Sequence, residues 1–187
     1  MPTSASEAIP YIVEFLREEV PHPKRILDVG VGFGKLGFLV RDYFEAKDQL
    51  RLTKNEWRIK LVGIEIYRKY ISTLQRYLYD EILIGDVFDT LPTLGKFDVA
   101  LLGDIIEHFE KEDGHRLLAE LFKHTKNILV STPYGYKAQG RIDGNINEAH
   151  KSGWTMKDFK PYTVVKQKKI LRIRRKENVL VVFLRQT

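Results

Sequence analysis

The sequence predicts an α/β fold in which a mostly parallel sheet carries helices on both faces. Short, nearly continuous apolar runs alternate along the chain with segments of helical spacing, which is typical of parallel strands buried on both sides. The 187 residues suffice for one well-buried domain and are too few for two of ordinary size. The final part of the chain departs from this alternation and contains two β-rich runs.

The spacing of apolar residues predicts each element in order. An amphipathic helix is expected from Ala5 to Val20, and "VPHPK" should end it because proline cannot continue the hydrogen-bond ladder. Strands are expected over residues 25–29, 59–64, 81–84, 97–102 and 127–131. Helices are expected over residues 35–46, 69–79 and about 113–125. Residues 164–174 and 179–185, joined by "KEN", predict an antiparallel hairpin.

The composition excludes several classes of protein. With 43% hydrophobic and 30% charged residues the chain should be globular, and without cysteine it has neither disulfides nor thiolate ligands or nucleophiles. No stretch approaches the roughly 18 apolar residues of a membrane span, and "MPTSASEAIPYIVEF" lacks the pattern of a secretory leader. We therefore expect a cytoplasmic protein with no membrane partner.

The formal charge of +6 comes from one segment. "KQKKILRIRRK", from Lys166 to Lys176, holds seven basic residues and no acid, so the rest of the chain is close to neutral. Two interpretations remain open. An edge strand often carries lysine and arginine to discourage pairing with other chains, and a basic strand can also bind RNA or another acidic partner.

The stretch "ILDVGVGFGKLGFLV", residues 26–40, contains two overlapping glycine patterns. The first reads Asp28-x-Gly30-x-Gly32-x-Gly34. The second, Gly32-x-Gly34-x-x-Gly37, is the dinucleotide fingerprint but begins two residues late. A fingerprint directly after the strand would need glycine where Lys35 stands, and Asp28 would repel a pyrophosphate. The sequence therefore disfavours a nicotinamide enzyme, and Gly37 is expected to pack its helix closely on the sheet.

Three later strands also end in acidic residues, where an open parallel sheet binds ligands. Glu65 follows the second strand and could accept hydrogen bonds from both hydroxyls of a ribose, although it could instead cap a helix. Asp86, followed by Val87, suits an adenine ring, although taken alone it is equally a turn aspartate. "GD", Gly103-Asp104, ends the fourth strand opposite the glycine loop.

In this order and spacing the motifs resemble the class I S-adenosylmethionine-dependent methyltransferases over most of the chain. The matching segments are "ILDVGVGFG", "GIE", "IGDVF", "FDVALLGDIIEHF", "ILVSTP" and the terminal hairpin. The resemblance implies a Rossmann-like seven-stranded mixed sheet of order 3-2-1-4-5-7-6, with strand 7 antiparallel. It also implies one methyltransferase domain over residues 1–187, comprising an N-terminal helix (1–22), a cofactor-binding core (24–132) and an acceptor-side loop with the hairpin (133–187).

The resemblance assigns roles to individual residues. The implied cofactor-binding residues are Asp28, Gly30, Gly32, Gly34, Glu65, Asp86, Val87, Gly103 and Asp104. Asp28 and the first three glycines would border the methionine part of S-adenosylmethionine, Glu65 the ribose, and Asp86 with Val87 the adenine. Gly103 and Asp104 would lie near the amino group and the sulfonium. The insertion "KDQLRLTKNEW" before the second strand departs from the family's spacing and is expected on the surface.

The acceptor side offers candidate catalytic residues at Asp104, His108 and His150. A helical turn beginning at Asp104 would bring it towards Glu107 and His108. The pattern also resembles the E-x-x-E-H and later histidine of metal-dependent RNA 3′-end 2′-O-methyltransferases, which would make Glu107, His108 and His150 metal ligands. Aspartate in place of the usual glutamate weakens that reading, so no metal is favoured.

The loop over residues 133–153 is long for its class and is expected to act as a lid. Tyr134, Tyr136 and Trp154 could line a pocket or serve as packing anchors, and the Thr155-x-x-Asp158 spacing predicts a helix start. The leading hypothesis is a methyltransferase for a small molecule. The alternatives are a metal-dependent RNA 2′-O-methyltransferase and a non-catalytic binding subunit with the same fold.

Overall fold

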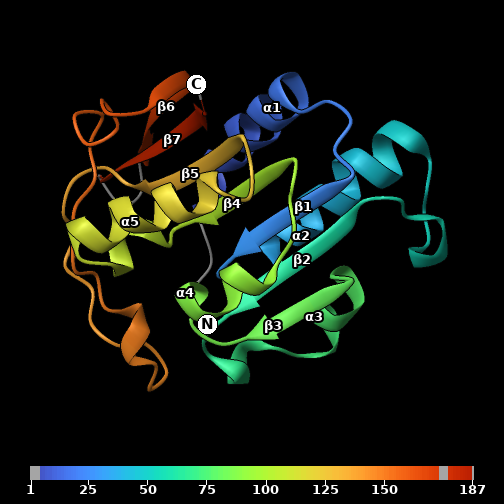
Figure 1. The fold of residues 1–187 in the computed structure, drawn as a ribbon, viewed down its shortest axis with the longest axis horizontal. Helices are drawn as coiled ribbons and strands as arrows, with labels where there is room; N and C mark the ends of the chain where they lie inside the picture. The colour runs from blue at the N-terminus through green and yellow to red at the C-terminus, as the bar shows by residue number, and fades with distance from the viewer. Residues whose placement is uncertain (1–4, 173–176, 187) are drawn as a thin grey trace.

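The structure is a computed structural model that describes residues 5–172 and 177–186 (Figure 1). Its seven strands form one sheet of order β3-β2-β1-β4-β5-β7-β6. They are β1 (Arg25–Val29), β2 (Lys60–Glu65), β3 (Glu81–Ile84), β4 (Val99–Gly103), β5 (Asn127–Pro133), β6 (Thr163–Arg172) and β7 (Glu177–Arg185). The first five pair in parallel, and β7 is antiparallel to both β5 and β6. The fold class and strand order predicted from the sequence are confirmed.

Helices connect the strands on both sides of the sheet. The α-helices are α1 (Ile9–Glu19), α2 (Lys35–Val40), α3 (Thr73–Leu78), α4 (Val87–Thr90) and α5 (Lys111–Phe122). A π-helix, η2 (Arg41–Lys47), continues α2. The short 3-10 turns are η1 (Ser6–Ala8), η3 (Lys54–Glu56), η4 (Arg68–Tyr70), η5 (Leu91–Thr93), η6 (Ile106–His108) and η7 (Ile146–Glu148). No helix in the described ranges has both the length and the apolar character needed to cross a membrane.

Two hydrophobic cores lie on opposite faces of the sheet, because successive residues of a strand point to opposite sides. Ile26 packs in the core with α1, α2 and the end of α3, whereas its neighbour Leu27 packs in the core with α4 and α5. In β7, Val181 and Val182 divide between the same two cores. The nearly continuous apolar strands seen in the sequence therefore reflect burial on both faces.

The helix boundaries differ from the predictions where local caps decide them. The helix predicted to start at residue 69 instead begins at Thr73, because Ser72 accepts a hydrogen bond from Leu74 N and Gln75 reaches back to Ser72 N at 3.0 Å. Apolar spacing missed α4, a single turn that Asp86 caps through Phe88 N. Residue 97, predicted to begin the fourth strand, forms only an isolated bridge to Thr125.

The insertion before β2 is held by buried charges that the sequence did not reveal. Arg41, 3% exposed, donates to the carbonyl oxygens of Ile59 and Leu78, and its guanidinium stacks on Trp57 at 4.3 Å. Glu45 is fully buried and accepts hydrogen bonds from Ile59 N and from the neighbouring backbone N–H. These satisfied charges fix the start of β2, and with it the position of Glu65.

In the described residues β6 pairs only with β7 and forms one edge of the sheet. Its basic side chains have partners within the chain: Lys166 pairs with Glu18, and Lys168 lies 5.1 Å from the ring centre of Tyr11. Arg172 lies 3.4 Å from the Glu7 carboxylate. Residues 173–176, which include the end of the predicted strand and part of the "KEN" turn, lie outside the described residues.

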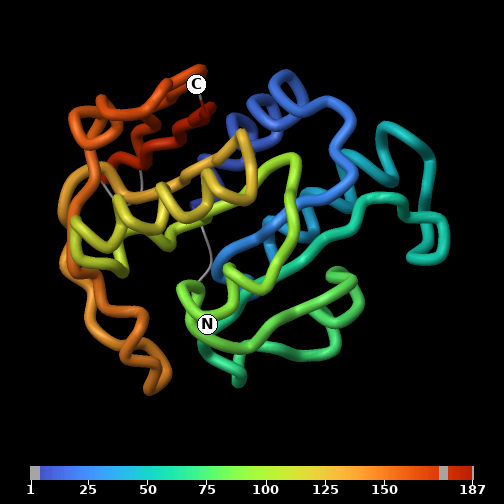
Figure 2. The backbone as a smooth tube through the Cα atoms, viewed as in Figure 1, coloured from blue at the N-terminus to red at the C-terminus, as the bar shows by residue number. Residues whose placement is uncertain are grey.

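The connection from β5 to β6, residues 134–162, runs away from the sheet before it returns to the hairpin, as the orange segment of Figure 2 shows. Thr155 and Asp158 make the expected capping contacts, with Thr155 N donating to Asp158 Oδ2 at 2.7 Å, but the segment forms turns and no helix. The helix start predicted here is therefore wrong, and the cap stabilises a loop.

Gly37→Ala is expected to destabilise the protein by about 1–3 kcal/mol, because a Cβ would lie 2.5 Å from the Tyr79 ring. The gain in helix propensity, at most about 1 kcal/mol, does not offset this overlap. Urea denaturation would measure the change, with Gly95→Ala as the matched control since nothing lies within 4 Å of a Cβ there. A Gly37→Ala variant as stable as Gly95→Ala would contradict the packing role.

Candidate active site

A cavity of about 270 Å³ opens at the carboxyl ends of the parallel strands. Its walls come from the turns after β1, β2, β3 and β4 and from the loop after β5. This is the place where open α/β sheets bind ligands, and the volume approaches that of small-molecule pockets. Gly30, Glu65, Asp86 and Asp104, which follow the four strands, all line it.

The turn after β1 brings bare backbone to the cavity. Gly30 has φ +80° and Gly32 φ +49°, a region that side chains rarely adopt. Gly32 N donates to Glu65 Oε2 at 2.9 Å, and Gly32 O accepts from Gln75 Nε2 at 2.8 Å. The loop is therefore fixed from both sides before any ligand binds.

Glu65 links this loop to the end of β2. Its second oxygen accepts from Tyr67 N at 2.8 Å, and the residue is 4% exposed. Burial raises the pKa of Glu65, and the bonds from Gly32 and Tyr67 act in the opposite direction. A carboxylate has about four acceptor positions, so two remain for hydroxyl groups of a ligand. No helix starts from a Glu65 cap, because the side chain bonds Tyr67 N without capping η4.

Asp28 and Gly34 do not line the cavity. Asp28 is 1% exposed and lies beneath the glycine loop, where its carboxylate accepts a short hydrogen bond from the hydroxyl of Tyr79. That hydroxyl in turn accepts from Gly37 N at 3.2 Å. Gly34, at φ +85°, caps α2. Both residues shape the loop from behind instead of facing a ligand.

The far end of the cavity is apolar with one acid. Asp86 and Val87 line it, and Asp86 Oδ1 accepts from Phe88 N at 2.8 Å. Phe109, which the sequence analysis did not single out, lines the same region and packs edge-on against Phe88 at 5.8 Å. An acid with apolar surfaces on both sides matches the needs of a flat heterocycle with an exocyclic amine.

Asp104 is held in a strained conformation at the end of β4. Its φ is +54°, and its backbone N–H donates to Ser131 O at 2.7 Å. The turn η6 begins at Ile106, so the helical turn expected to start at Asp104 is not formed. Asp104 Oδ1 is buried and has no hydrogen-bond partner among the described residues. Burial raises the pKa of Asp104 to about 6.

Glu107 lies beside Asp104 and is 2% exposed. Thr132, a residue of β5 that the sequence analysis did not identify, donates its hydroxyl to Glu107 Oε2 at 2.9 Å. The other oxygen, Oε1, is buried with no hydrogen-bond partner in the described part of the chain. Burial raises the pKa of Glu107 well above its usual range, and the neighbouring charge of Asp104 raises it further.

His108 and His150 meet across the cavity with ring centres 5.0 Å apart. Nδ1 of His108 lies 3.3 Å from Ala149 O, and Nδ1 of His150 lies 2.7 Å from Lys137 O. A carbonyl only accepts, so each Nδ1 carries the proton and each Nε2 keeps a lone pair. Burial lowers the pKa of both rings, which favours this neutral form.

Ligand atoms of Glu107, His108 and His150 lie within 4.8 Å of one another. The cluster has the chemistry of a metal site, since neutral imidazoles and a carboxylate bind divalent ions and the Nδ1 hydrogen bonds orient the rings. The three residues that the sequence suggested as ligands are thus brought together.

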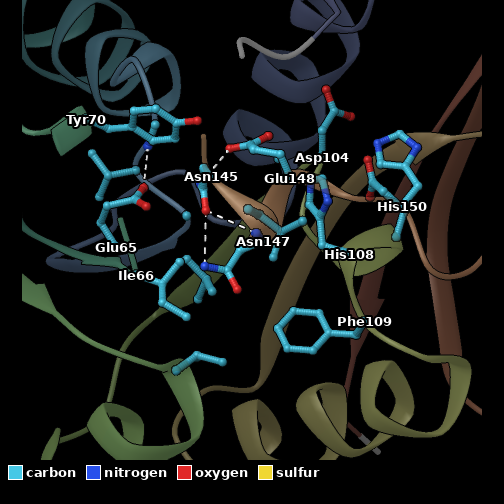
Figure 3. A pocket seen from close by; sticks show the side chains of 18 of the residues that line it. Glu65, Ile66, Tyr70, Asp104, His108, Phe109, Asn145, Asn147, Glu148 and His150 are labelled. Carbon is cyan, nitrogen blue, oxygen red and sulfur yellow. Dashed lines mark hydrogen bonds between the residues drawn. The ribbon is translucent and has the colours of Figure 1, made fainter. Parts of the chain in front are cut away.

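The loop after β5 covers the cavity from the side of His150. Asn145 and Glu148 are 3% and 7% exposed, and they lie between Tyr70 on one side and His108 on the other (Figure 3). Asn145 donates to Glu148 Oε1 at 3.3 Å, and Tyr67 donates its hydroxyl to Asp143 O at 3.2 Å. This loop reaches across to the turn after β2 and forms one wall of the cavity, and its role as a lid stays a prediction.

The aromatic residues of this loop do not line the cavity. Trp154 is fully buried, lies 5.4 Å from Phe159 and carries the Lys111 ammonium over its ring at 4.0 Å. Of the two roles that the sequence left open for Tyr134, Tyr136 and Trp154, Trp154 has that of a packing anchor and holds the loop on α5.

The contribution of Asp28 to the stability of the protein is expected to fall as pH rises from about 5 to 7. Burial raises the pKa of Asp28 to about 7, whereas an unfolded aspartate titrates near 3.9. Between these values the native state binds the extra proton, so one such group changes the unfolding free energy by up to about 1.4 kcal/mol per pH unit. Urea denaturation at several pH values should show a smaller slope for Asp28→Asn than for wild type or for the exposed control Asp89→Asn. Equal slopes would refute the assignment.

Solved structures share the fold of this chain. No family model matches the chain, and curated proteins give no significant sequence match. The 1,6-didemethyltoxoflavin-N1-methyltransferase of Burkholderia thailandensis, solved with its substrate and S-adenosylhomocysteine, is 17% identical with a TM-score of 0.65 over 97% of this chain and 80% of that one. Magnesium protoporphyrin IX methyltransferase of Synechocystis is 14% identical, with a TM-score of 0.63 over 96% of this chain and 78% of that one. The methyltransferase domain of bacterial CtHen1 is 17% identical, with a TM-score of 0.60 over 97% of this chain and 98% of that one.

The chain has the class I methyltransferase fold. The strand order β3-β2-β1-β4-β5-β7-β6 and the antiparallel β7 agree with these structures, so the resemblance seen in the sequence is confirmed at the level of the fold. In the methyltransferase fold of this chain the cavity lies at the ends of β1 to β4. At 14–17% identity the likeness concerns the fold alone.

Proposed function

We propose that this chain is an S-adenosylmethionine-dependent methyltransferase. The observation that carries the proposal is the cavity of about 270 Å³ into which the ends of β1, β2, β3 and β4 place bare glycine backbone and three acids in turn. Solved proteins of the same fold bind S-adenosylmethionine or S-adenosylhomocysteine. Calorimetry with S-adenosylmethionine and with NAD tests the proposal, and binding of NAD alone would overturn it.

The residues present fit this cofactor. Glu65 has two acceptor positions available for the ribose hydroxyls, and Asp86 with Val87 and Phe109 offers an acid and apolar walls for adenine. At the opposite end, the unpartnered Oδ1 of Asp104 suits an ammonium group. When bound, the cofactor supplies an electrophilic methyl group on a positively charged sulfonium.

The acids around the cavity and the two histidines have separate roles in the proposed reaction. Asp104 offers a carboxylate oxygen to a cationic group of a ligand, whereas burial and the neighbouring Asp104 raise the pKa of Glu107 and favour its neutral form. His108 and His150 hold free Nε2 lone pairs that could take a proton from a hydroxyl or amine of the acceptor. The rigid glycine loop and η6 would align the acceptor, and such positioning supplies on the order of 7 kcal/mol or more.

We infer that the acceptor is a small molecule. The loop carrying Asn145 and Glu148 forms one wall of a cavity of about 270 Å³, and the basic strand β6 makes charge contacts within the chain. The toxoflavin and protoporphyrin enzymes act on small molecules in the same fold. Intact mass analysis of small metabolites and of RNA after incubation with labelled cofactor tests this, and a labelled product only in RNA would overturn it.

The cluster of Glu107, His108 and His150 supports a second candidate, a metal-dependent RNA 2′-O-methyltransferase. Its ligand atoms lie within 4.8 Å of one another, and both rings have the tautomer that metal binding requires. A divalent ion there would orient a ribose hydroxyl and lower its pKa. A chain that binds the cofactor but yields no product without a partner protein would instead be a non-catalytic subunit.

A further inference from the structure

Three basic side chains surround the Asp104 end of the cavity, and none of them has a role in the function proposed above. Lys35, Lys137 and Arg172 all line the cavity, and their charges all act on the Asp104 carboxylate. They come from the start of α2, from the loop after β5 and from the end of β6. This end therefore presents charges of both signs to a ligand.

Arg172 has one donor atom without a hydrogen bond. Its Nε is buried without a hydrogen-bond partner among the described residues, and its side chain is 16% exposed. The Glu7 carboxylate lies 3.4 Å from Nε of Arg172, and the Glu177 carboxylate lies 3.8 Å from its Nη1. A buried donor without a hydrogen bond is costly unless a ligand completes it, and a guanidinium fork matches a carboxylate.

An unpartnered acceptor and an unpartnered donor thus line the same end of one cavity. The acceptor is Asp104 Oδ1, and the donor is Arg172 Nε. A ligand with an ammonium and a carboxylate on one carbon would satisfy both groups. The α-amino acid is the common chemical group of this kind.

We propose that Arg172, assisted by Lys35, binds the carboxylate of the amino-acid end of the cofactor, opposite Asp104, which takes the ammonium. This inference rests on the proposed function and extends the binding site to the C-terminal hairpin. It also gives one residue of the basic segment 166–176 a role inside the chain. Glu7 competes for Arg172 and is displaced from it when the carboxylate binds.

The proposal separates two ligands that share a nucleoside. S-adenosylhomocysteine carries the amino-acid end, and 5′-methylthioadenosine lacks it. Calorimetry with both should show that Arg172→Gln lowers affinity for S-adenosylhomocysteine about 10-fold or more and leaves affinity for 5′-methylthioadenosine unchanged. The affinity of Arg172→Lys for S-adenosylhomocysteine should lie between those of wild type and Arg172→Gln, since lysine keeps the positive charge but lacks the two-pronged guanidinium. Lys168→Gln is the matched control on the same strand, because that side chain lies over Tyr11.

A purely structural role for Arg172, tethering residue 7 to the hairpin, gives different results. Loss of the tether would weaken the binding of S-adenosylhomocysteine and of 5′-methylthioadenosine equally, and Glu7→Gln would weaken the binding of both as well. The proposal instead expects Glu7→Gln to keep or raise affinity for S-adenosylhomocysteine, and thermal melting would confirm that each variant is folded. Equal losses for both ligands, or unchanged affinity in folded Arg172→Gln, would overturn it. Wild type that binds 5′-methylthioadenosine as tightly as S-adenosylhomocysteine would overturn this inference alone, whereas wild type that binds neither would overturn the proposed function as well.

Discussion

Glu65→Gln is expected to weaken binding of S-adenosylmethionine by about 10-fold or more. Hydrogen bonds to a charged group contribute about 1.5–3 kcal/mol each, and the substitution removes the charge that two ribose hydroxyls would use. Both oxygens of Glu65 accept hydrogen bonds, one from Gly32 N and one from Tyr67 N. The NH₂ group of glutamine would therefore face one of these two N–H donors and lose its hydrogen bond. Titration calorimetry measures the change directly.

The control is Glu81→Gln, at an exposed carboxylate on β3 that pairs with Lys60 at 3.3 Å. It removes the same charge outside the cavity and should leave affinity unchanged. Melting curves would show whether the Glu65 variant keeps its fold. Affinity within twofold of wild type in a folded Glu65→Gln protein would reject the assignment of Glu65 to the ribose.

Divalent metal should produce the second large effect if the cluster of Glu107, His108 and His150 holds an ion, as the RNA candidate requires. Saturation at 100 times Kd stabilises a native state by about 2.7 kcal/mol. For a chain of this size each kcal/mol corresponds to about 2–4 °C in Tm, so Mn²⁺ or Zn²⁺ should raise Tm by several degrees. Excess EDTA should reverse the shift.

His150→Gln should abolish this shift, because it removes the Nε2 lone pair. His124→Gln is the control: His124 contacts Gly95 O and lies outside the cavity. The small-molecule candidate expects no shift with either ion and full turnover in EDTA. The same measurement therefore decides between the two acceptors.

The position of the cavity could be predicted from the sequence because strand ends carry strong local signals. Glu65, Asp86 and Asp104 each follow an apolar run, and parallel topology brings such ends to one edge of the sheet. Asp28 shows the limit of that reasoning. It lies one residue inside β1 on the same face as Ile26, so its side chain points to Tyr79 beneath the loop. The alternation of strand faces could have revealed this.

The remaining features depend on contacts between distant parts of the chain. Tyr67 meets Asp143 across the cavity, and Arg172 meets Glu7, over separations that leave no periodic pattern in the sequence. The position of Trp154 also depends on contacts with a distant part of the chain. It anchors the loop because Lys111 and His115 of α5 pack against its ring. Local spacing therefore predicted the elements and the strand ends, and packing decided the rest.

The interior position of β7 has a consequence for synthesis of the protein. This strand lies between β5 and β6, and its central residues from Val179 to Leu184 are at most 2% exposed. During translation the first five strands can pair while β5 still presents an open, apolar edge, and that edge closes only after residue 185 has left the ribosome. The fold is thus completed late, by strands whose described residues contribute one side chain, that of Arg172, to the cavity wall.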